Sequence, residues 1–161
     1  MFKKLTMIAL PVVGGLLVGK LATSNARKDY EAYKNPPFSP PGYVFPVVWP
    51  ILYTSMGISH MLVTEKGTDK ENKRNNTVYF TQLSLNYIWS LLYFKYKLRG
   101  TALIESFVLL SVATLTTREF YRAYKPAGLI LVPYVIWLSY ASYLTSGSYV
   151  LNHNNEDYEN E

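Results

Sequence analysis

Three tryptophans and two amides at helical spacing are the side chains best suited to chemistry in this sequence. Trp49, Trp89 and Trp137 each lie in the middle of a different apolar stretch, or one turn from it. Gln82 and Asn86 precede Trp89 so that all three share one face of a helix. Indole rings stack on flat ligands, and an amide in apolar surroundings needs a hydrogen-bonding partner. The pattern favours a cavity with aromatic walls and orienting amides, although each indole taken alone also fits ordinary core packing.

Five apolar stretches must position these residues. They span 5–23, 43–64, 77–94, 101–121 and 128–151. A helix rises ~1.5 Å per residue, so each stretch is about long enough to cross a hydrocarbon core of ~30 Å. The strict alternation of a membrane β-barrel is absent from the sequence. We therefore predict an all-α integral membrane bundle of five transmembrane helices, forming a single domain over residues 1–161 in a lipid bilayer.

The connections differ in character. Residues 24–35 are polar and can form a short helix, whereas the run from Pro36 to Gly42 contains four prolines and cannot. We expect segment 24–42 to be a stiff lid over one end of the bundle. Residues 65–76 are expected to form a mixed-charge turn, and residues 152–161 an acidic tail. Small residues that would allow close helix contact are Gly14, Gly15, Gly19 and Ala102.

The composition argues against several classes of function. With no Cys and only two His, no metal cluster is expected. The net charge is +5, but the charges gather in loops that flank the spans, where they orient helices, so nucleic-acid binding is not predicted. The first stretch has an alternative interpretation as a cleaved signal peptide, because Lys3 and Lys4 precede an apolar run that ends in small residues.

Several blocks of residues, in order along nearly the whole chain, resemble the TspO/MBR family of tryptophan-rich sensory proteins. The matching positions are Tyr30, Pro36, Pro40 and Pro41 in the first loop, Phe45, Trp49, Tyr53, Met56 and Gly57 in the second span, Gln82, Asn86, Trp89 and Ser90 in the third, and Pro133, Tyr134, Trp137, Ala141, Leu144, Leu151 and Asn152 in and after the fifth. Asp29 and Phe38 stand where the family usually has tryptophan, and Asn35 where it has lysine. No Lys or Arg follows Tyr149, so the sterol-recognition pattern of animal members is missing.

The resemblance implies a membrane receptor or sensor that binds tetrapyrroles such as protoporphyrin IX, and benzodiazepine-type ligands, inside the bundle. It implies no covalently bound cofactor, a homodimer and, for a chain without the sterol pattern, a bacterial plasma membrane. The ligand-binding residues it implies, together with their helical neighbours, are Tyr30, Phe45, Trp49, Tyr53, Gln82, Asn86, Trp89, Tyr93, Tyr134, Trp137 and Ala141. An alternative is an enzyme that degrades porphyrin with light and oxygen, with Trp49 and Trp137 as catalytic residues. A secondary transporter is a third interpretation, which the absence of an inverted repeat disfavours.

A porphyrin carries propionates, so its binding also calls for cations. Stacking contributes only ~0.5–1.5 kcal/mol for each aromatic pair, whereas micromolar affinity requires about 8 kcal/mol. Two basic groups on the lid side of the bundle are candidates for pairing with the propionates. They are Arg27, Lys28 and Lys34 in the first loop, and Lys95, Lys97 and Arg99 between the third and fourth spans.

Overall fold

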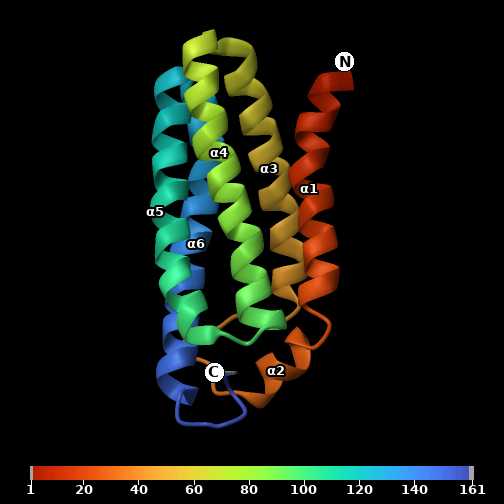
Figure 1. Cartoon of the computed structure of the whole chain (residues 1–161), viewed down its shortest axis with the longest axis vertical. Helices are drawn as coiled ribbons and strands as arrows, with labels where there is room; N and C mark the ends of the chain where they lie inside the picture. Colours follow the sequence, from red (N-terminus) through yellow and green to blue (C-terminus); the bar gives the residue numbers. More distant parts are fainter. Residues whose placement is uncertain (1, 160–161) are drawn as a thin grey trace.

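Long helices follow the apolar stretches. In the computed structural model, which describes residues 2–159, they are α1 (Phe2–Ala22), α3 (Val44–Lys66), α4 (Asp69–Ser90), α5 (Arg99–Ala123) and α6 (Lys125–Asn152), as Figure 1 shows. The short helix α2 (Ala26–Ala32) lies in the first loop, as the polar sequence predicted, and the π-helical turn η1 (Leu91–Lys95) continues α4. Residues 2–159 contain no strand, so the prediction of an all-α chain is confirmed.

Four of the described helices, α1, α3, α5 and α6, are long and apolar enough to cross a membrane. The chain is therefore an integral membrane protein. The prediction of five transmembrane helices is met for these four only. Helix α4 falls outside the set because its first two turns are polar, and because Gln82 and Asn86 interrupt its apolar part.

Helix α4 begins at Asp69, so the prediction of a turn over 65–76 is wrong for most of that segment. Thr68 caps the helix: its Oγ1 accepts from the Glu71 backbone N–H at 3.4 Å, and Glu71 Oε2 accepts from the Thr68 N–H at 2.8 Å. These reciprocal bonds satisfy backbone donors that the helix start leaves free. They also hold the pKa of the exposed Glu71 carboxyl below its usual value. The cap therefore extends the helix through residues too polar for a membrane interior.

Helix α1 lies against α3 at the edge of the bundle, where glycines allow a close approach (Figure 1). A Cβ added to Gly57 would lie 2.6 Å from the Cα of Ile8 on α1. Gly14 and Gly15 are covered by tyrosine rings of α4 and α3, and Ala102 is fully buried. Gly19 has nothing within 4 Å of an added Cβ. Of the four small residues predicted for close contact, three are thus packed within the chain and only Gly19 is open.

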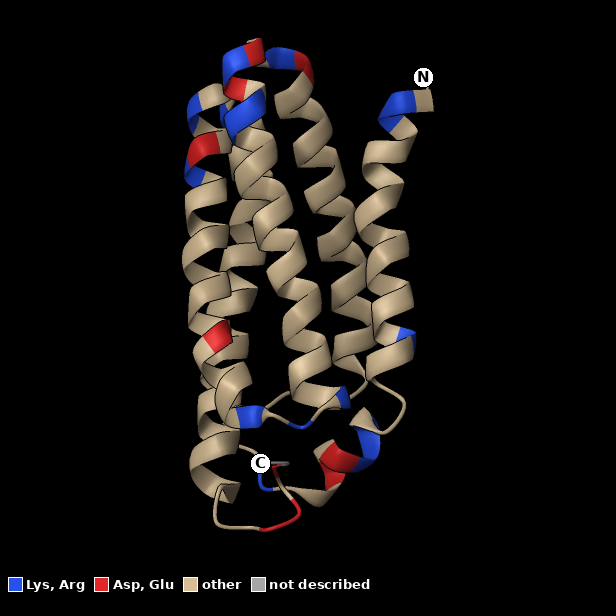
Figure 2. Cartoon of the chain, viewed as in Figure 1, with Lys and Arg blue, Asp and Glu red and all other residues tan. Residues whose placement is uncertain are grey.

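Charged residues gather at the two ends of the bundle and leave a largely uncharged middle (Figure 2). One end holds the start of α1 and the α3–α4 and α5–α6 connections. The other holds the first loop, the connection from η1 to α5, and the C-terminal segment. This separation fits helices that cross a membrane with their charged loops in water on either side.

Candidate functional site

A chain of hydrogen bonds joins three helices in the middle of the bundle. The Tyr53 hydroxyl of α3 donates to Asn86 Oδ1 of α4 at 2.6 Å, and Asn86 Nδ2 donates to the Tyr134 hydroxyl of α6 at 3.2 Å. Tyr134 in turn donates to Gln82 Oε1 at 2.8 Å. All four side chains are buried. The predicted amide face of α4 therefore points into the bundle, where its amides bond to two tyrosines.

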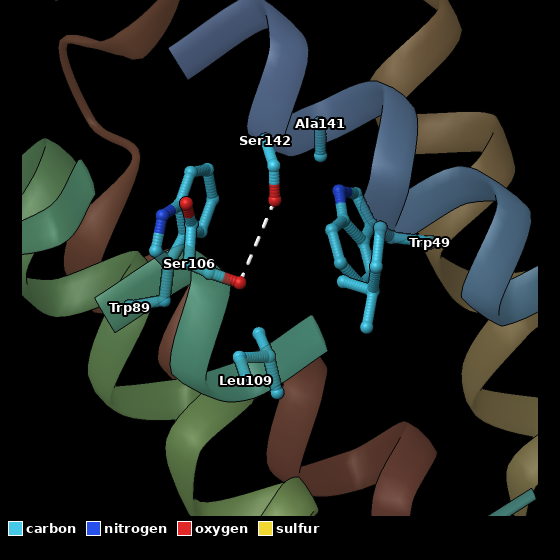
Figure 3. A pocket seen from close by; sticks show the side chains of 7 residues that line it. Trp49, Trp89, Ser106, Leu109, Ala141 and Ser142 are labelled. Atoms are coloured by element: carbon cyan, nitrogen blue, oxygen red, sulfur yellow. Dashed lines mark hydrogen bonds between the residues drawn. The ribbon is translucent and has the colours of Figure 1, made fainter. Parts of the chain in front are cut away.

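A small cavity lies where α3, α4, α5 and α6 meet. Its volume is about 10 Å³, roughly enough for a single water molecule. Figure 3 shows Trp49 and Trp89 on opposite sides of it, with Ala141 and Ser142 on one edge and Leu109 on the other. Its remaining lining residues are Ser106 and Leu138. Two indoles on opposite sides, with small and apolar side chains along the edges, form a narrow slot with aromatic walls.

Trp137 is absent from the residues that line the cavity and lies instead beneath the first loop. Its ring makes an edge contact with Phe45 at 6.0 Å between centroids, and Phe45 contacts Tyr30 at 5.5 Å in the same manner. The indole N–H groups of Trp89 and Trp137 are buried without a hydrogen-bond partner among the described residues. Among the described residues, both indoles therefore keep an unpaired donor, and that of Trp89 belongs to a residue of the cavity wall.

Tyrosine hydroxyls hold the proline-rich part of the first loop in place. Tyr140 of α6 donates to the Phe38 carbonyl at 2.5 Å, and Tyr143 donates to the Pro37 carbonyl at 2.8 Å. Tyr30 donates to the Pro40 carbonyl at 2.5 Å, and its partial burial raises its pKa. Prolines lack a backbone N–H, so this segment forms few hydrogen bonds within its own backbone, and the tyrosine hydroxyls tie it to the bundle instead. The loop closes the end of the bundle above Phe45 and Trp137.

The C-terminal segment packs against the same loop instead of extending into solvent as a free tail. The side chain of Asn152 accepts from the Lys34 N–H at 3.0 Å and donates to the Lys34 carbonyl at 2.8 Å. The Tyr33 hydroxyl donates to the Asp157 carbonyl at 2.7 Å. Tyr158 is fully buried, which raises its pKa, and its hydroxyl lies 2.9 Å from Ser148 Oγ.

The structure divides the residues predicted for the site into three neighbouring groups. Trp49, Trp89 and Ala141 line the cavity, Tyr53, Gln82, Asn86 and Tyr134 form the hydrogen-bonded chain, and Tyr30, Phe45 and Trp137 lie under the loop. Tyr93 stacks on Trp89 at 5.2 Å.

Sequence analysis missed four residues of the cavity wall. Leu138 and Ser142 flank predicted positions on α6, so helical periodicity was a usable signal for them. Ser106 and Leu109 on α5 carry no such signal, because small and apolar residues are common throughout that helix.

Comparison with known proteins places this arrangement in a family. The chain matches the TspO/MBR family over residues 7–150, and it belongs to that family. It is 35% identical over 149 residues to the tryptophan-rich protein TspO of Chlorobaculum tepidum, covering 89% of this chain and 94% of that protein. It is 29% identical to the translocator protein of Bos taurus, covering 84% and 81%. It is 30% identical to the tryptophan-rich sensory protein of Cereibacter sphaeroides, covering 78% and 77%.

Proposed function

We propose that this protein is a five-span receptor that binds tetrapyrroles of the protoporphyrin IX type, and benzodiazepine-type ligands, between its helices. In this proposal α4 crosses the membrane as the fifth span and keeps its amides inside the bundle. The observation that carries the proposal is the pair of facing indoles, Trp49 and Trp89, on a slot between four helices. A planar aromatic ligand is the chemical class that can stack on aromatic walls of this kind.

The unsatisfied donors support the same class of ligand. A buried indole N–H without a partner costs free energy, which a ligand acceptor would recover. Trp89 and Trp137 both carry such a group. The amides of Gln82 and Asn86 are already bonded to tyrosines, so in this proposal they fix the shape of the wall beneath the ligand.

The slot is closed in the conformation described here. Ligand pockets typically enclose about 300–1,000 Å³, whereas this cavity encloses about 10 Å³. A macrocycle therefore enters only if Trp89 or the first loop moves. The π-helical turn η1 immediately follows α4 close to Trp89, and such turns are less regular than α-helix. Movement at that point would widen the slot without breaking the chain Tyr53–Asn86–Tyr134.

Titration of the purified protein with protoporphyrin IX in detergent tests the proposal. Replacing either wall, Trp49→Leu or Trp89→Leu, should weaken binding about two- to tenfold because one stacking surface is lost. Phe107→Leu is the matched control, since Phe107 is 50% exposed on α5. If the unaltered protein does not bind the porphyrin, or if the control weakens binding as much as the wall variants, the proposal fails.

Illuminating the same sample in the presence of oxygen distinguishes a receptor from the alternative, a light-dependent enzyme that degrades porphyrin. Trp49 lies 5.5 Å from Tyr53 between ring centroids, a spacing that suits transfer of an oxidising equivalent between rings. A discrete porphyrin product that disappears in Trp49→Phe and Trp137→Phe would favour an enzyme. Binding without such a product favours a receptor.

The assembly and the host membrane are also part of the proposal. We place the protein in a bacterial plasma membrane as a homodimer, with Gly19 as the only one of the four predicted small residues left to meet a partner helix. Crosslinking in membranes tests the dimer.

A further inference from the structure

Arg99, the first residue of α5, is a buried cation with unused binding capacity. Only 2% of its surface is exposed, and its guanidinium lies over the rings of Tyr33, Tyr93 and Tyr158 at 4.7, 5.3 and 4.3 Å from their centroids. Such cation–π contacts stabilise the charge, but a buried guanidinium also needs hydrogen-bond acceptors. Arg99 Nε has none among the described residues.

The acidic partner of Arg99 fills only part of that capacity. Asp29 Oδ2 accepts from Arg99 Nη2 at 3.0 Å, and the same oxygen lies 3.9 Å from Lys97 Nζ. A guanidinium can hold both oxygens of a carboxylate through two parallel N–H groups. Here one donor is bonded and the neighbouring Nε is free, so the pair is monodentate. The other acid nearby, Glu159, accepts from the backbone N–H of Gly100.

A stack of rings connects Arg99 to the wall of the cavity. Arg99 lies over Tyr93, Tyr93 stacks on Trp89 with an angle of 15° between ring planes, and Trp89 lines the slot. The guanidinium is therefore two ring contacts away from the site, on the same side as the first loop. Asp29 belongs to α2 in that loop, which is one of the two parts whose movement would admit a macrocycle.

We propose that Arg99 binds a carboxylate of the ligand, and that Asp29 occupies its place while the site is empty. This inference rests on the proposed function. When the loop opens, Asp29 leaves with α2, and a ligand carboxylate takes both Nη2 and Nε of Arg99. Of the six candidate cations for a propionate, Arg99 alone is buried, and it is therefore the one least screened by water. The ligand class is thus a planar aromatic molecule with a carboxylate at its periphery. The carboxylate must reach Arg99, which is separated from the cavity wall by the ring of Tyr93.

The experiment compares protoporphyrin IX with its dimethyl ester, which keeps the macrocycle and removes the charge. Arg99→Gln should weaken binding of the diacid about tenfold or more, since hydrogen bonds to charged groups are the strong ones, and should leave the ester within about twofold. The affinity of Arg99→Lys for the diacid should lie between those of the unaltered protein and Arg99→Gln. Lysine keeps the positive charge but lacks the two parallel N–H groups of the guanidinium. Asp29→Asn should strengthen binding of the diacid about threefold and leave the ester unchanged, because the internal competitor is gone.

Two matched controls separate ligand binding from loss of an ion pair in general. Arg74→Gln removes one of the two cations on the buried Glu119, at 2.7 Å, near the start of α4 and thus at the opposite end of the bundle from the first loop. Glu31→Gln removes an exposed acid from the same short helix as Asp29. Neither should change the ratio of diacid to ester affinity.

Several outcomes would overturn the inference. Equal loss of diacid and ester binding in Arg99→Gln would make Arg99 purely structural, and a weaker diacid in Asp29→Asn would make Asp29 a support of the site. If Arg99→Gln does not fold, the unaltered protein still decides: diacid binding must exceed ester binding and must weaken with salt. Equal affinities overturn the inference alone, whereas failure of both porphyrins to bind overturns the proposed function.

Discussion

At the scale of single residues, Asn86 has the most demanding position in the bundle. Its amide is 1% exposed and serves two tyrosine hydroxyls at once, accepting from Tyr53 and donating to Tyr134. Among the described residues, Asn86 is the side-chain hydrogen-bond partner of the Tyr53 hydroxyl. A residue of the same size without polar atoms would leave both hydroxyls less well satisfied.

Asn86→Leu should therefore lower the free energy of unfolding by about 2–4 kcal/mol, because a buried polar group without a partner costs about 1–3 kcal/mol. Denaturant unfolding in detergent, followed by circular dichroism, measures the change. Asn154→Leu, at an exposed position, should have little effect. A similar small change for both variants would mean that water replaces the lost amide.

Residue types predicted the inner face of α4 but not the pairing around Arg99. Gln82, Asn86 and Trp89 share a face by spacing alone, and the cost of burying amides fixes which way that face points. Asp29 and Arg99 are separated by 70 positions, and nothing local relates them. Their contact arises from the fold of the first loop onto the start of α5.

At the scale of helices, the crossing of α1 and α3 depends on Gly57. The backbone of Ile8 occupies the space where any other residue would place its Cβ, and backbone cannot rotate away as a side chain can. The close approach of α1 to α3 at Ile8 therefore requires glycine at position 57.

Gly57→Ala should separate α1 from α3 and destabilise the protein by about 1–3 kcal/mol, the usual cost of overpacking. Gly19→Ala, with nothing within 4 Å, should leave stability unchanged or raise it by up to ~1 kcal/mol through better helix propensity. Thermal unfolding of the two variants side by side provides the measurement. Equal melting temperatures would show that α1 shifts without cost.

The sequence predicts where the long helices lie, but the prediction of a turn over 65–76 is wrong for the start of α4 at Asp69. Apolar runs located the long helices because the membrane fixes their length. The polar run 69–76 looked like a turn by composition, yet Thr68 and Glu71 carry the spacing of a capping box, a signal that composition alone ignores.

At the scale of the whole molecule, the slot is closed, so the protein must open before a macrocycle can bind between the helices. The first loop is held by Tyr140 and Tyr143 of α6 and by the C-terminal segment through Asn152. All of these contacts lie at the end of the bundle above the cavity.

The observed rate of porphyrin binding should therefore level off as porphyrin concentration rises, because the opening rate becomes limiting. Stopped-flow absorbance of the porphyrin band measures it. Tyr140→Phe, which removes one bond to the loop, should raise the plateau, and Tyr121→Phe, at the opposite end of the bundle on α5, should not. A rate that rises in proportion to concentration throughout would contradict a closed ground state.

The C-terminal segment folds back onto the first loop, which its sequence does not predict. Its acidic residues predict exposure, and Glu156 and Asp157 are exposed, but Tyr158 beside them is fully buried against Arg99 and Ser148. Residues 160–161 of the predicted acidic tail lie outside the described residues. A single aromatic residue in a polar run gives no indication of which surface it will cover.

The placement of the indoles gives the protein a built-in optical probe. All three tryptophans lie either on the slot or under the loop, and α1, α2 and α5 contain none. Light absorbed selectively by indole will therefore be re-emitted only from this region, with no background from the rest of the chain. A shift in the wavelength of maximum tryptophan emission would report entry of water into this region, without any added label or ligand.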